Sequence, residues 1–268
     1  MVPEFHLASA SGNAFAYLWA REAPEGFEGP RWARGLCAPG RGLALDGLFL
    51  LQTPRPGARW AMEHWDADGS ASFCSNGTRA ALAVPGAPER DEVLATSNGM
   101  EVHLRRNGLL AGIRMPEGPD FGLRPVSLDL PEPHTYGWIG NPQLVVERSG
   151  VAALDLGAFA RPLRRHPGFK EGTNVNVVEV LDRGRARIRS WERGVEGETL
   201  CCGTGCAVAG AWLSSRTGQS EWVFETAGGE AVRVTAEAVT EGAWRGLWLQ
   251  GPVHLAGAFR PGPSGVPW

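Results

Sequence analysis

The chain has 268 residues, of which 43% are hydrophobic and 21% are charged, and its formal net charge is −3 at pH 7. This is the composition of an ordinary soluble chain with enough apolar residues for two cores. The charge gives no electrostatic support to a nucleic-acid partner, and no apolar run approaches the roughly 20 residues of a membrane span. The start lacks a basic stretch before an apolar one, so we expect a cytoplasmic protein.

The counts of cysteine and lysine argue against a disulfide framework and against the common cofactors. Five cysteines are an odd number in a chain too large to need covalent staples, which favours reduced thiols. Lys170 is the only lysine, and no phosphate-cradling glycine run lies near it, so pyridoxal phosphate is not expected. No C-x-x-C pair or paired histidines supply the spacing of a zinc site, so no metal is expected either.

The first half of the chain is predicted to run strand, loop, helix and then strands. Apolar and alternating segments predict strands at 15–19, 43–51, 60–65, 92–96, 100–105 and 109–115, and a short helix at 77–84. Asn107-Gly108 is a hairpin signal between the last two strands, because both residues tolerate positive φ. The turn-rich stretch at 115–120 then favours a domain boundary.

The second half repeats this order. It predicts strands at 135–139, 144–147, 174–181, 186–191, 222–225, 231–235 and 244–249, and helices at 151–160 and 204–215. The arginines that alternate over 183–189 are expected to form one solvated face of a strand. We predict domains at 1–118 and 119–268, with an irregular tail at 259–268 that could return to the first domain.

Two cysteine motifs indicate an internal duplication. Cys74-Ser-Asn-Gly and Cys202-Gly-Thr-Gly each lead into a small-residue helix. A tryptophan with acidic and glycine residues precedes each motif, and a T-x-x-G-x-x-V segment follows each one, at 96–102 and 226–232. The period is about half the chain, which suits two similar domains. The other cysteines, Cys37, Cys201 and Cys206, are expected to be buried structural residues.

A cysteine at a helix start is placed for acid and base chemistry. The first backbone N–H groups of a helix have no partner within it, so they attract anions and are expected to lower the pKa of a thiol. Two such starts facing each other across a cleft could hold one carboxylate and place a thiol on either side of its α-carbon. That geometry is the one required by a two-base racemase.

Segments spread over nearly the whole chain resemble the diaminopimelate epimerase family, in that family's order. They are Gly12-Asn13 with Phe15, Ala67-Asp68-Gly69-Ser70, Cys74 with Asn76-Gly77 and Arg79, Gly140-Asn141-Pro142, Thr173-Asn174, Glu192-Arg193-Gly194, and Glu198-Thr199-Leu200 before Cys202-Gly203-Thr204-Gly205. The resemblance implies an α+β fold of two pseudo-symmetric domains, each a mostly antiparallel sheet wrapped around a central helix. It also implies an active site between the domains, no cofactor and no metal.

By the same resemblance, Cys74 and Cys202 are the catalytic pair of an isomerase that converts LL-diaminopimelate to meso-diaminopimelate, a precursor of lysine and peptidoglycan. The implied substrate-binding residues are Asn13, Asp66, Ser75, Asn76, Asn141, Asn174, Glu192, Arg193, Gly203 and Thr204. Among these, the helix starts hold the reacting carboxylate, and Arg193 suits a distal carboxylate through its planar fork. The assembly is open, with a homodimer as one alternative. Which of the two cysteines is the thiolate at rest is also open.

Four departures from the family pattern leave the substrate open. Ser75 stands where the family has glycine, Ala14 replaces an aspartate, Gln143 replaces a histidine, and Asp66 replaces an asparagine that contacts the distal end of the substrate. An aspartate there would repel a carboxylate and attract an ammonium. Ornithine, lysine or histidine racemisation is therefore one alternative, and a non-catalytic binding homologue is another. An isomerase of the phenazine-biosynthesis type shares the fold but is not expected to keep both cysteines.

Overall fold

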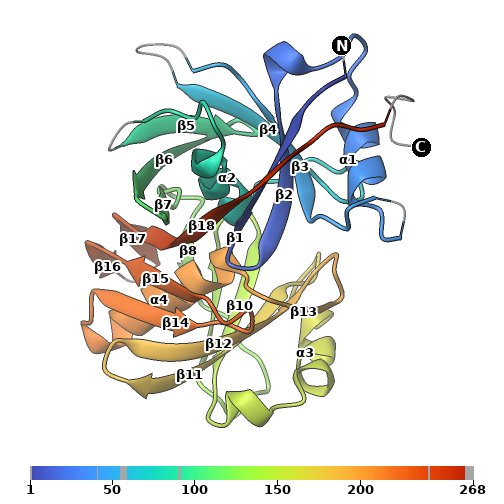
Figure 1. Cartoon of the computed structure of the whole chain (residues 1–268). Coiled ribbons are helices and arrows are strands. Elements are labelled where there is room, and N and C mark those ends of the chain that lie inside the picture. The colour runs from blue at the N-terminus through green and yellow to red at the C-terminus, as the bar shows by residue number, and fades with distance from the viewer. Residues whose placement is uncertain (1, 41, 55–58, 90–91, 241, 263–268) are drawn as a thin grey trace. The chain divides into compact units, whose positions relative to one another are not determined.

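The computed structural model describes residues 2–40, 42–54, 59–89, 92–240 and 242–262, which form two compact domains (Figure 1). The N-terminal domain comprises Met1–Ile113 and Pro252–Trp268, and the C-terminal domain comprises Arg114–Gly251. The division after Ile113 lies near the turn-rich stretch at 115–120, and the chain returns to the N-terminal domain from Pro252 onward. No helix in the described part of the chain is long and apolar enough to cross a membrane.

The helices and strands of the N-terminal domain follow the predicted order, with additions. Its elements are β1 (Phe5–Ala10), β2 (Asn13–Trp19), η1 (Ala20–Glu22), α1 (Gly29–Cys37), β3 (Gly47–Leu51), β4 (Trp60–Asp66), α2 (Ser75–Ala80), η2 (Ala81–Ala83), β5 (Val93–Ser97), β6 (Met100–Asn107) and β7 (Leu110–Arg114). The sequence did not predict β1 or α1. A hairpin joins β6 and β7 as predicted, but its turn is at Gly108 (φ 59°) and Leu109, because Asn107 is the last residue of β6.

The C-terminal domain repeats the order with more strands. Its elements are β8 (Gly122–Arg124), β9 (His134–Trp138), β10 (Pro142–Glu147), η3 (Val151–Ala153), α3 (Leu156–Arg164), β11 (Asn174–Asp182), β12 (Arg185–Glu192), β13 (Gly197–Thr199), α4 (Gly203–Thr217), β14 (Glu221–Glu225), β15 (Ala231–Thr235), β16 (Ala238–Thr240), β17 (Ala243–Arg245) and the beginning of β18 (Trp248–Phe259), which continues into the N-terminal domain from Pro252. The helix predicted at 151–160 begins only at Leu156, because the Asp155 side chain caps it by accepting a 3.0 Å hydrogen bond from the Ala158 amide.

Strand pairing shows the internal duplication directly. In the N-terminal domain β1–β2 is antiparallel, β2–β3 parallel, β3–β4 antiparallel, β4–β5 parallel and β5–β6 antiparallel. The C-terminal domain has the same sequence of pairings in β9–β10, β10–β11, β11–β12, β12–β14 and β14–β15. The helices fall at matching places in the two series. The predicted α+β fold of two pseudo-symmetric, mostly antiparallel domains is confirmed.

The strands of each domain wrap around a central helix, α2 in one domain and α4 in the other (Figure 1). All six residues of α2 are buried, and α4 is buried from Gly203 to Leu213. A helix buried on every side must carry small residues where strands approach it. A Cβ added to Gly77 would lie 2.3 Å from the ring of Phe49, and one added to Gly210 would lie 2.5 Å from Val234. A glycine in each central helix therefore allows the close approach of a neighbouring strand.

A second helix in each domain covers the other face of the strands. In β3, Leu48 packs with Trp32 and Leu36 of α1, whereas the next residue, Phe49, lies against α2. Alternate side chains of a strand point to opposite faces, so β3 contributes to two cores. In the C-terminal domain α3 takes the corresponding place against β11 and β12.

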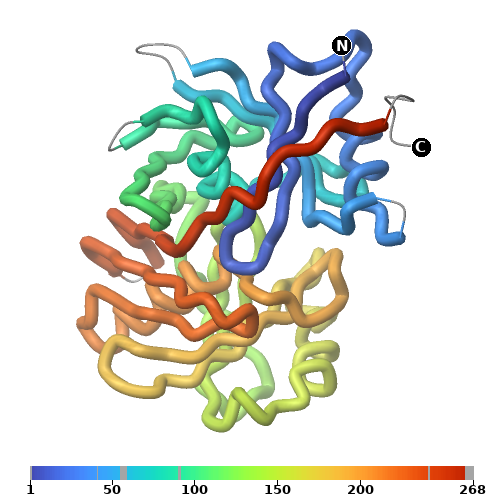
Figure 2. The backbone as a smooth tube through the Cα atoms, in the orientation of Figure 1, coloured from blue at the N-terminus to red at the C-terminus, as the bar shows by residue number. Residues whose placement is uncertain are grey.

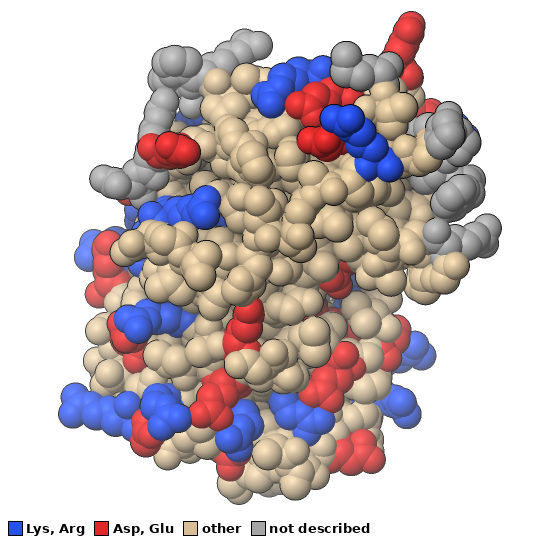
Figure 3. Space-filling model, in the orientation of Figure 1, with Lys and Arg blue, Asp and Glu red and all other residues tan. Residues whose placement is uncertain are grey.

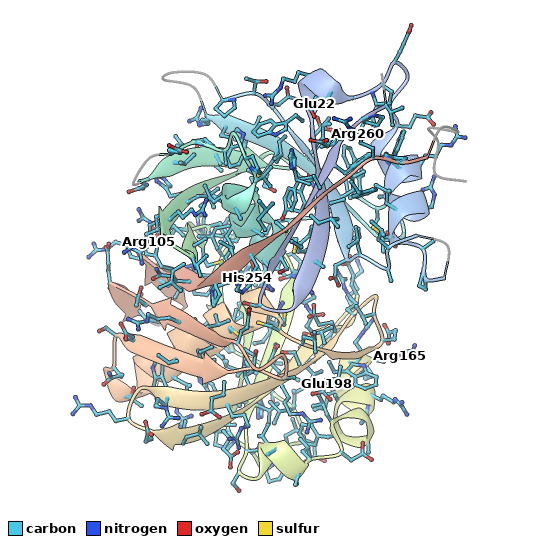
Figure 4. All side chains as sticks on the ribbon, in the orientation of Figure 1. Glu22, Arg105, Arg165, Glu198, His254 and Arg260 are labelled. Carbon is cyan, nitrogen blue, oxygen red and sulfur yellow. The ribbon has the colours of Figure 1, made fainter. Side chains whose placement is uncertain are left out.

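The last strand continues ten residues beyond the predicted end at 249, to Phe259. β18 pairs with β15 at its beginning and with β1 along Val253–Phe259, and Figure 2 shows the latter run beside the first strand. An ion pair of 2.9 Å between Arg260, labelled in Figure 4, and Glu4 continues this pairing. Gly251, Pro252 and Gly257 look like loop residues in the sequence, but the partner strand β1 keeps this segment extended.

The alternating arginines share one face of β12, as predicted, but this face is only partly solvated, since the Arg189 side chain is 19% exposed. On β12, Arg185 and Arg187 pair with Glu225 at 2.8 and 2.9 Å, and Arg189 donates two 2.7 Å hydrogen bonds to Glu198, which is labelled in Figure 4. Figure 3 shows acidic and basic side chains interspersed on the visible face rather than gathered by sign. These charges neutralise one another.

Candidate active site

Cys74 lies at the start of the central helix of the N-terminal domain. It is the N-cap of α2, with an extended backbone (φ −121°, ψ 110°), and its side chain is half-buried. The Gly77 amide donates a hydrogen bond of 3.5 Å to its sulfur. An N-cap side chain ordinarily accepts from the amide two or three residues on, so the thiol takes the place that a serine hydroxyl usually has. The Tyr17 hydroxyl donates to the Gly77 carbonyl at 2.7 Å and anchors this turn.

Cys202 occupies the corresponding place in the C-terminal domain. It is the N-cap of α4 (φ −94°, ψ 101°), and the Gly205 amide donates to its sulfur at 3.4 Å. Unlike Cys74, it is buried. Both motifs thus form one local structure, in which a thiol accepts from the amide of a glycine three residues later. Cys37, Cys201 and Cys206 are also buried, as predicted.

The protonation of Cys202 differs from the expectation for a helix start. Burial raises the pKa of the Cys202 thiol well above its ordinary value, and the charge of Glu192 raises it further. The Thr204 hydroxyl and the Gly205 amide lower the pKa but do not reverse the rise. The expected lowering is wrong for Cys202, because removal from water penalises the thiolate more than two hydrogen bonds stabilise it. Cys202 therefore holds its proton at neutral pH.

The structure brings the other N-terminal candidates to the same helix start. Asn76, in the first turn of α2, donates to the Asn13 side chain at 2.9 Å, and its own oxygen accepts from Arg79 at 3.3 Å. Ser75 is buried beside them. Asn13 begins β2, so one hydrogen bond joins that strand to the turn that carries Cys74.

An acidic pair lies at the same edge of the sheet. Asp46 immediately precedes β3, and Asp66 ends β4, where Gly47 pairs with Asp66. Since β2 and β3 are parallel and pair Phe15 with Gly47, Asn13 is near both carboxylates. Asp46 accepts a 2.8 Å hydrogen bond from the Ala14 amide, and Asp66 is 42% exposed. Sequence reasoning missed Asp46, because only the pairing of β3 with β2 and β4 brings it to this edge.

Electrostatics couple the two carboxylates. Burial raises the pKa of Asp46, and the charge of Asp66 raises it further, while hydrogen bonds from the Ala14 amide and the Asn13 side chain lower it. The buried His64 ring lies with its Nε2 3.7 Å from Asp66, and burial lowers the pKa of His64, so the ring is neutral at neutral pH. Within the described residues, no arginine or lysine forms an ion pair with either carboxylate. The edge beside Asn13 is therefore negatively charged.

The C-terminal candidates gather around the start of α4. Gln143 donates to Asn141 at 3.0 Å and to Thr204 at 2.8 Å, and its oxygen lies 3.7 Å from the Cys202 sulfur. Gly203 is buried in the same first turn. Asn141, Thr204 and Cys202 thus share one neighbour, Gln143, which the sequence singled out only as a departure from the family pattern.

Three further candidates lie where β11 begins and β12 ends. The Arg193 amide donates to the Asn174 side chain at 2.8 Å, and Glu192 accepts from the Thr199 hydroxyl at 2.5 Å. The Arg193 guanidinium lies 3.5 Å from the exposed carboxylate of Glu171, an ion pair too solvated to hold it firmly. Arg193 can therefore turn to another carboxylate. Within the described residues no cluster of three or more His, Cys, Asp or Glu side chains could hold a metal ion.

Comparison with known proteins identifies sequence relatives over most of the chain. A family model described as diaminopimelate epimerase matches residues 135–252. A diaminopimelate epimerase of Synechococcus sp. is 30% identical over 279 residues, covering 92% of this chain and 94% of that protein. The enzyme of that name from Zymomonas mobilis is 31% identical over 246 residues, covering 87% and 89%.

Solved structures with this fold carry several activities. A phenazine biosynthesis protein of Bacillus anthracis matches with TM-score 0.68 and 16% identity, covering 97% of this chain and 98% of that one. A hydroxyproline epimerase of Agrobacterium vitis, with bound trans-4-hydroxy-L-proline, matches with TM-score 0.65 and 14% identity, covering 99% and 94%. At these identities the likeness shows the fold alone.

Proposed function

The chain belongs to the diaminopimelate epimerase family of isomerases, and we propose that it converts LL-diaminopimelate to meso-diaminopimelate with Cys74 and Cys202 as its acid and base. One observation carries the proposal. At the start of the central helix in both halves of a duplicated fold, a cysteine sulfur accepts a hydrogen bond from the amide of the glycine three residues later. One thiol per half is what inversion at a single carbon requires, since the two faces of that carbon need separate proton carriers.

In this mechanism a thiolate takes the α-proton, so that the C–H bond breaks as an S–H bond forms. The negative charge spreads into the substrate carboxylate, and the backbone N–H groups at the two helix starts, from Ser75 and Asn76 and from Gly203 and Thr204, stabilise it. The opposite thiol then donates its proton to the other face of the carbon. Configuration inverts, and no electron leaves the substrate, so a redox cofactor is not needed.

The two thiols divide the roles according to their surroundings. Burial and the Glu192 charge keep Cys202 protonated, so we assign it the proton donor's role when the LL isomer reacts. The half-buried Cys74 then removes the proton. In the reverse direction the roles exchange, as microscopic reversibility demands. Because Cys202 already carries its proton, it can act as the donor without a preceding proton transfer.

A second substrate class is favoured by one observation, the acidic pair Asp46 and Asp66 beside Asn13. Asp66 stands where the family has an asparagine that contacts the distal end of the substrate. A carboxylate there repels the distal carboxylate of diaminopimelate and attracts an ammonium. Racemisation of ornithine, lysine or histidine is therefore the second candidate, with the same pair of thiols.

A panel assay separates the two candidates. Reduced protein is incubated with LL-diaminopimelate, L-ornithine, L-lysine and L-histidine, and chiral chromatography follows the inverted product. The proposal predicts turnover of diaminopimelate, and the Asp66→Asn variant should raise kcat/KM for it by about tenfold, because a like charge near the distal carboxylate is removed. If a basic amino acid is the substrate, the same variant should lower its kcat/KM by a similar factor.

The matched control is Glu63→Gln, which removes one negative charge from the exposed side of the same strand. It should leave the order of substrates unchanged. Inversion of none of the four amino acids by folded, reduced protein would contradict both candidates.

A further inference from the structure

Cys202, Gln143 and Thr204 form a closed ring of hydrogen bonds. The Gln143 Nε2 donates to the Thr204 hydroxyl at 2.8 Å, the Thr204 hydroxyl lies 3.6 Å from the Cys202 sulfur, and that sulfur lies 3.7 Å from the Gln143 Oε1. All three side chains are buried. Sulfur is large and forms longer hydrogen bonds than oxygen, so the two contacts to sulfur are also hydrogen bonds. Each of the three contacts in the ring therefore has one proton between its two heavy atoms.

The direction of the ring is set by a backbone carbonyl outside it. The Asn176 Nδ2 donates to the Leu144 carbonyl at 3.1 Å, and a carbonyl can only accept, so the amide of Asn176 has one orientation. The same Nδ2 lies 2.8 Å from Gln143, which must present its oxygen there. The Ser190 hydroxyl completes the arrangement by donating to the Asn176 Oδ1 at 2.7 Å.

That orientation decides which way the thiol points. The Gln143 oxygen faces Asn176 and Cys202, and its nitrogen faces Asn141 and Thr204. Because the Thr204 oxygen already accepts from Gln143, its own proton is left for the Cys202 sulfur. The remaining proton, that of the thiol, points to the Gln143 oxygen. An amide cannot reverse these roles, since its N–H groups cannot accept.

We propose that Gln143 is a positioning residue that holds Cys202 as a thiol and opposes its thiolate form. The inference rests on the proposed function, in which Cys202 is the proton donor. Once Cys202 has given up its proton, the Thr204 hydroxyl and the Gly205 amide still stabilise the sulfur, but the Gln143 oxygen faces it without a proton between them. That contact favours reprotonation. The charged and titratable groups acting on Cys202 are Glu192 of β12 and the neighbouring Cys201, which act in the same direction.

The substitution at this position gives the ring a fixed polarity. The family that the chain resembles has a histidine here, a side chain that titrates near neutral pH and can either donate or accept. The amide of Gln143 does not titrate, and it can donate only through its nitrogen and accept only through its oxygen. The bias of Cys202 toward the thiol should therefore persist across the physiological range of pH.

The test measures Cys202 itself rather than turnover. The full chain is alkylated with iodoacetamide over a range of pH, and peptide mapping gives the midpoint at which Cys202 becomes reactive. Gln143→Met keeps the volume but removes the acceptor, so we expect about tenfold more Cys202 thiolate at a given pH, a midpoint lower by about one pH unit. Gln143→Glu keeps an acceptor and adds a negative charge, and should raise the midpoint. Thr204→Val removes a donor to the sulfur and should also raise it.

Ser190→Ala is the matched control, because Ser190 belongs to the same network but touches Asn176 rather than the thiol. General loosening of the domain would shift the midpoint in Ser190→Ala as much as in Gln143→Met, and this result would overturn the proposal. So would an unchanged midpoint in Gln143→Met or a lowered one in Gln143→Glu. Because alkylation needs no substrate, the proposal can fail while the parent protein still inverts an amino acid, and the two failures are distinguishable.

Discussion

Replacement of either Cys74 or Cys202 by alanine should reduce inversion of the substrate by roughly 10³-fold or more, because each face of the α-carbon loses its only proton carrier. Chiral chromatography under conditions that saturate the parent protein provides the measurement. Serine in place of either cysteine should behave differently, since a hydroxyl is a poor base but can still hold a proton. Slow exchange on one face can survive in those variants.

The chain offers matched controls for the alanine variants. Cys37 lies in α1 and Cys206 in α4, and both are buried cysteines that the mechanism does not use. Alanine at either position should keep activity close to that of the parent protein. Full activity in Cys74→Ala or Cys202→Ala would refute the two-base mechanism, whatever the controls show.

Mild oxidation of the substrate-free protein should abolish activity, and a thiol reductant should restore it. Two thiols that serve one carbon must approach closely enough to form an S–S bond of about 2.05 Å once the site is empty. Diamide serves as the oxidant: it takes up the two electrons and two protons that the thiols release. Peptide mapping should find Cys74 joined to Cys202, and saturating substrate should protect against the loss.

A second disulfide has to be distinguished from this one. The sulfurs of Cys201 and Cys206 lie 4.0 Å apart within the C-terminal domain, so diamide could join these two instead. The double variant Cys201→Ala/Cys206→Ala removes that route and should remain sensitive to oxidation. If the double variant resists diamide, or if mapping finds only the Cys201–Cys206 bond, then Cys74 and Cys202 do not meet at one carbon.

The duplicated cysteine motif was predictable because its structure is local. A cysteine followed three residues later by glycine defines both the cap and the amide that the sulfur accepts from, and these lie within one turn of helix. The repeated order of strands and helices could be predicted for the same reason. The alternation of apolar and polar residues within a segment identifies most strands. The matching segment in the other half of the chain then supports each of these predictions.

Features that depend on distant partners were missed. The helix α1 begins with Gly29-Pro30 and contains Gly35, so its propensity is weak, and it depends on burying Trp32 and Leu36 against the sheet. The extension of β18 past Pro252 depends on β1 at the other end of the chain. Neither the helix α1 nor the extension of β18 can be recognised from a short stretch of sequence alone.

The site shows the same division between local and long-range information. The sequence identified Asp66 and Gln143 as departures but could not place Asp46 beside the first or Asn176 beside the second. The raised pKa of Cys202 was also out of reach, because burial by surrounding strands, rather than the helix start, decides it. Local patterns thus predicted the reaction, while long-range packing sets protonation and charge.

Hydrogen isotope exchange tests the central claim, inversion by two separate thiols, most directly. The reduced protein is given the reactive L-amino acid of the panel in heavy water, and substrate and product are analysed before equilibrium is approached. Two thiols predict product that carries deuterium at the α-carbon and remaining substrate that carries almost none, because the donor's proton comes from solvent while the base can return the original one. Product that retains the substrate's own hydrogen would contradict the account, since a single group would then have carried the proton to both faces.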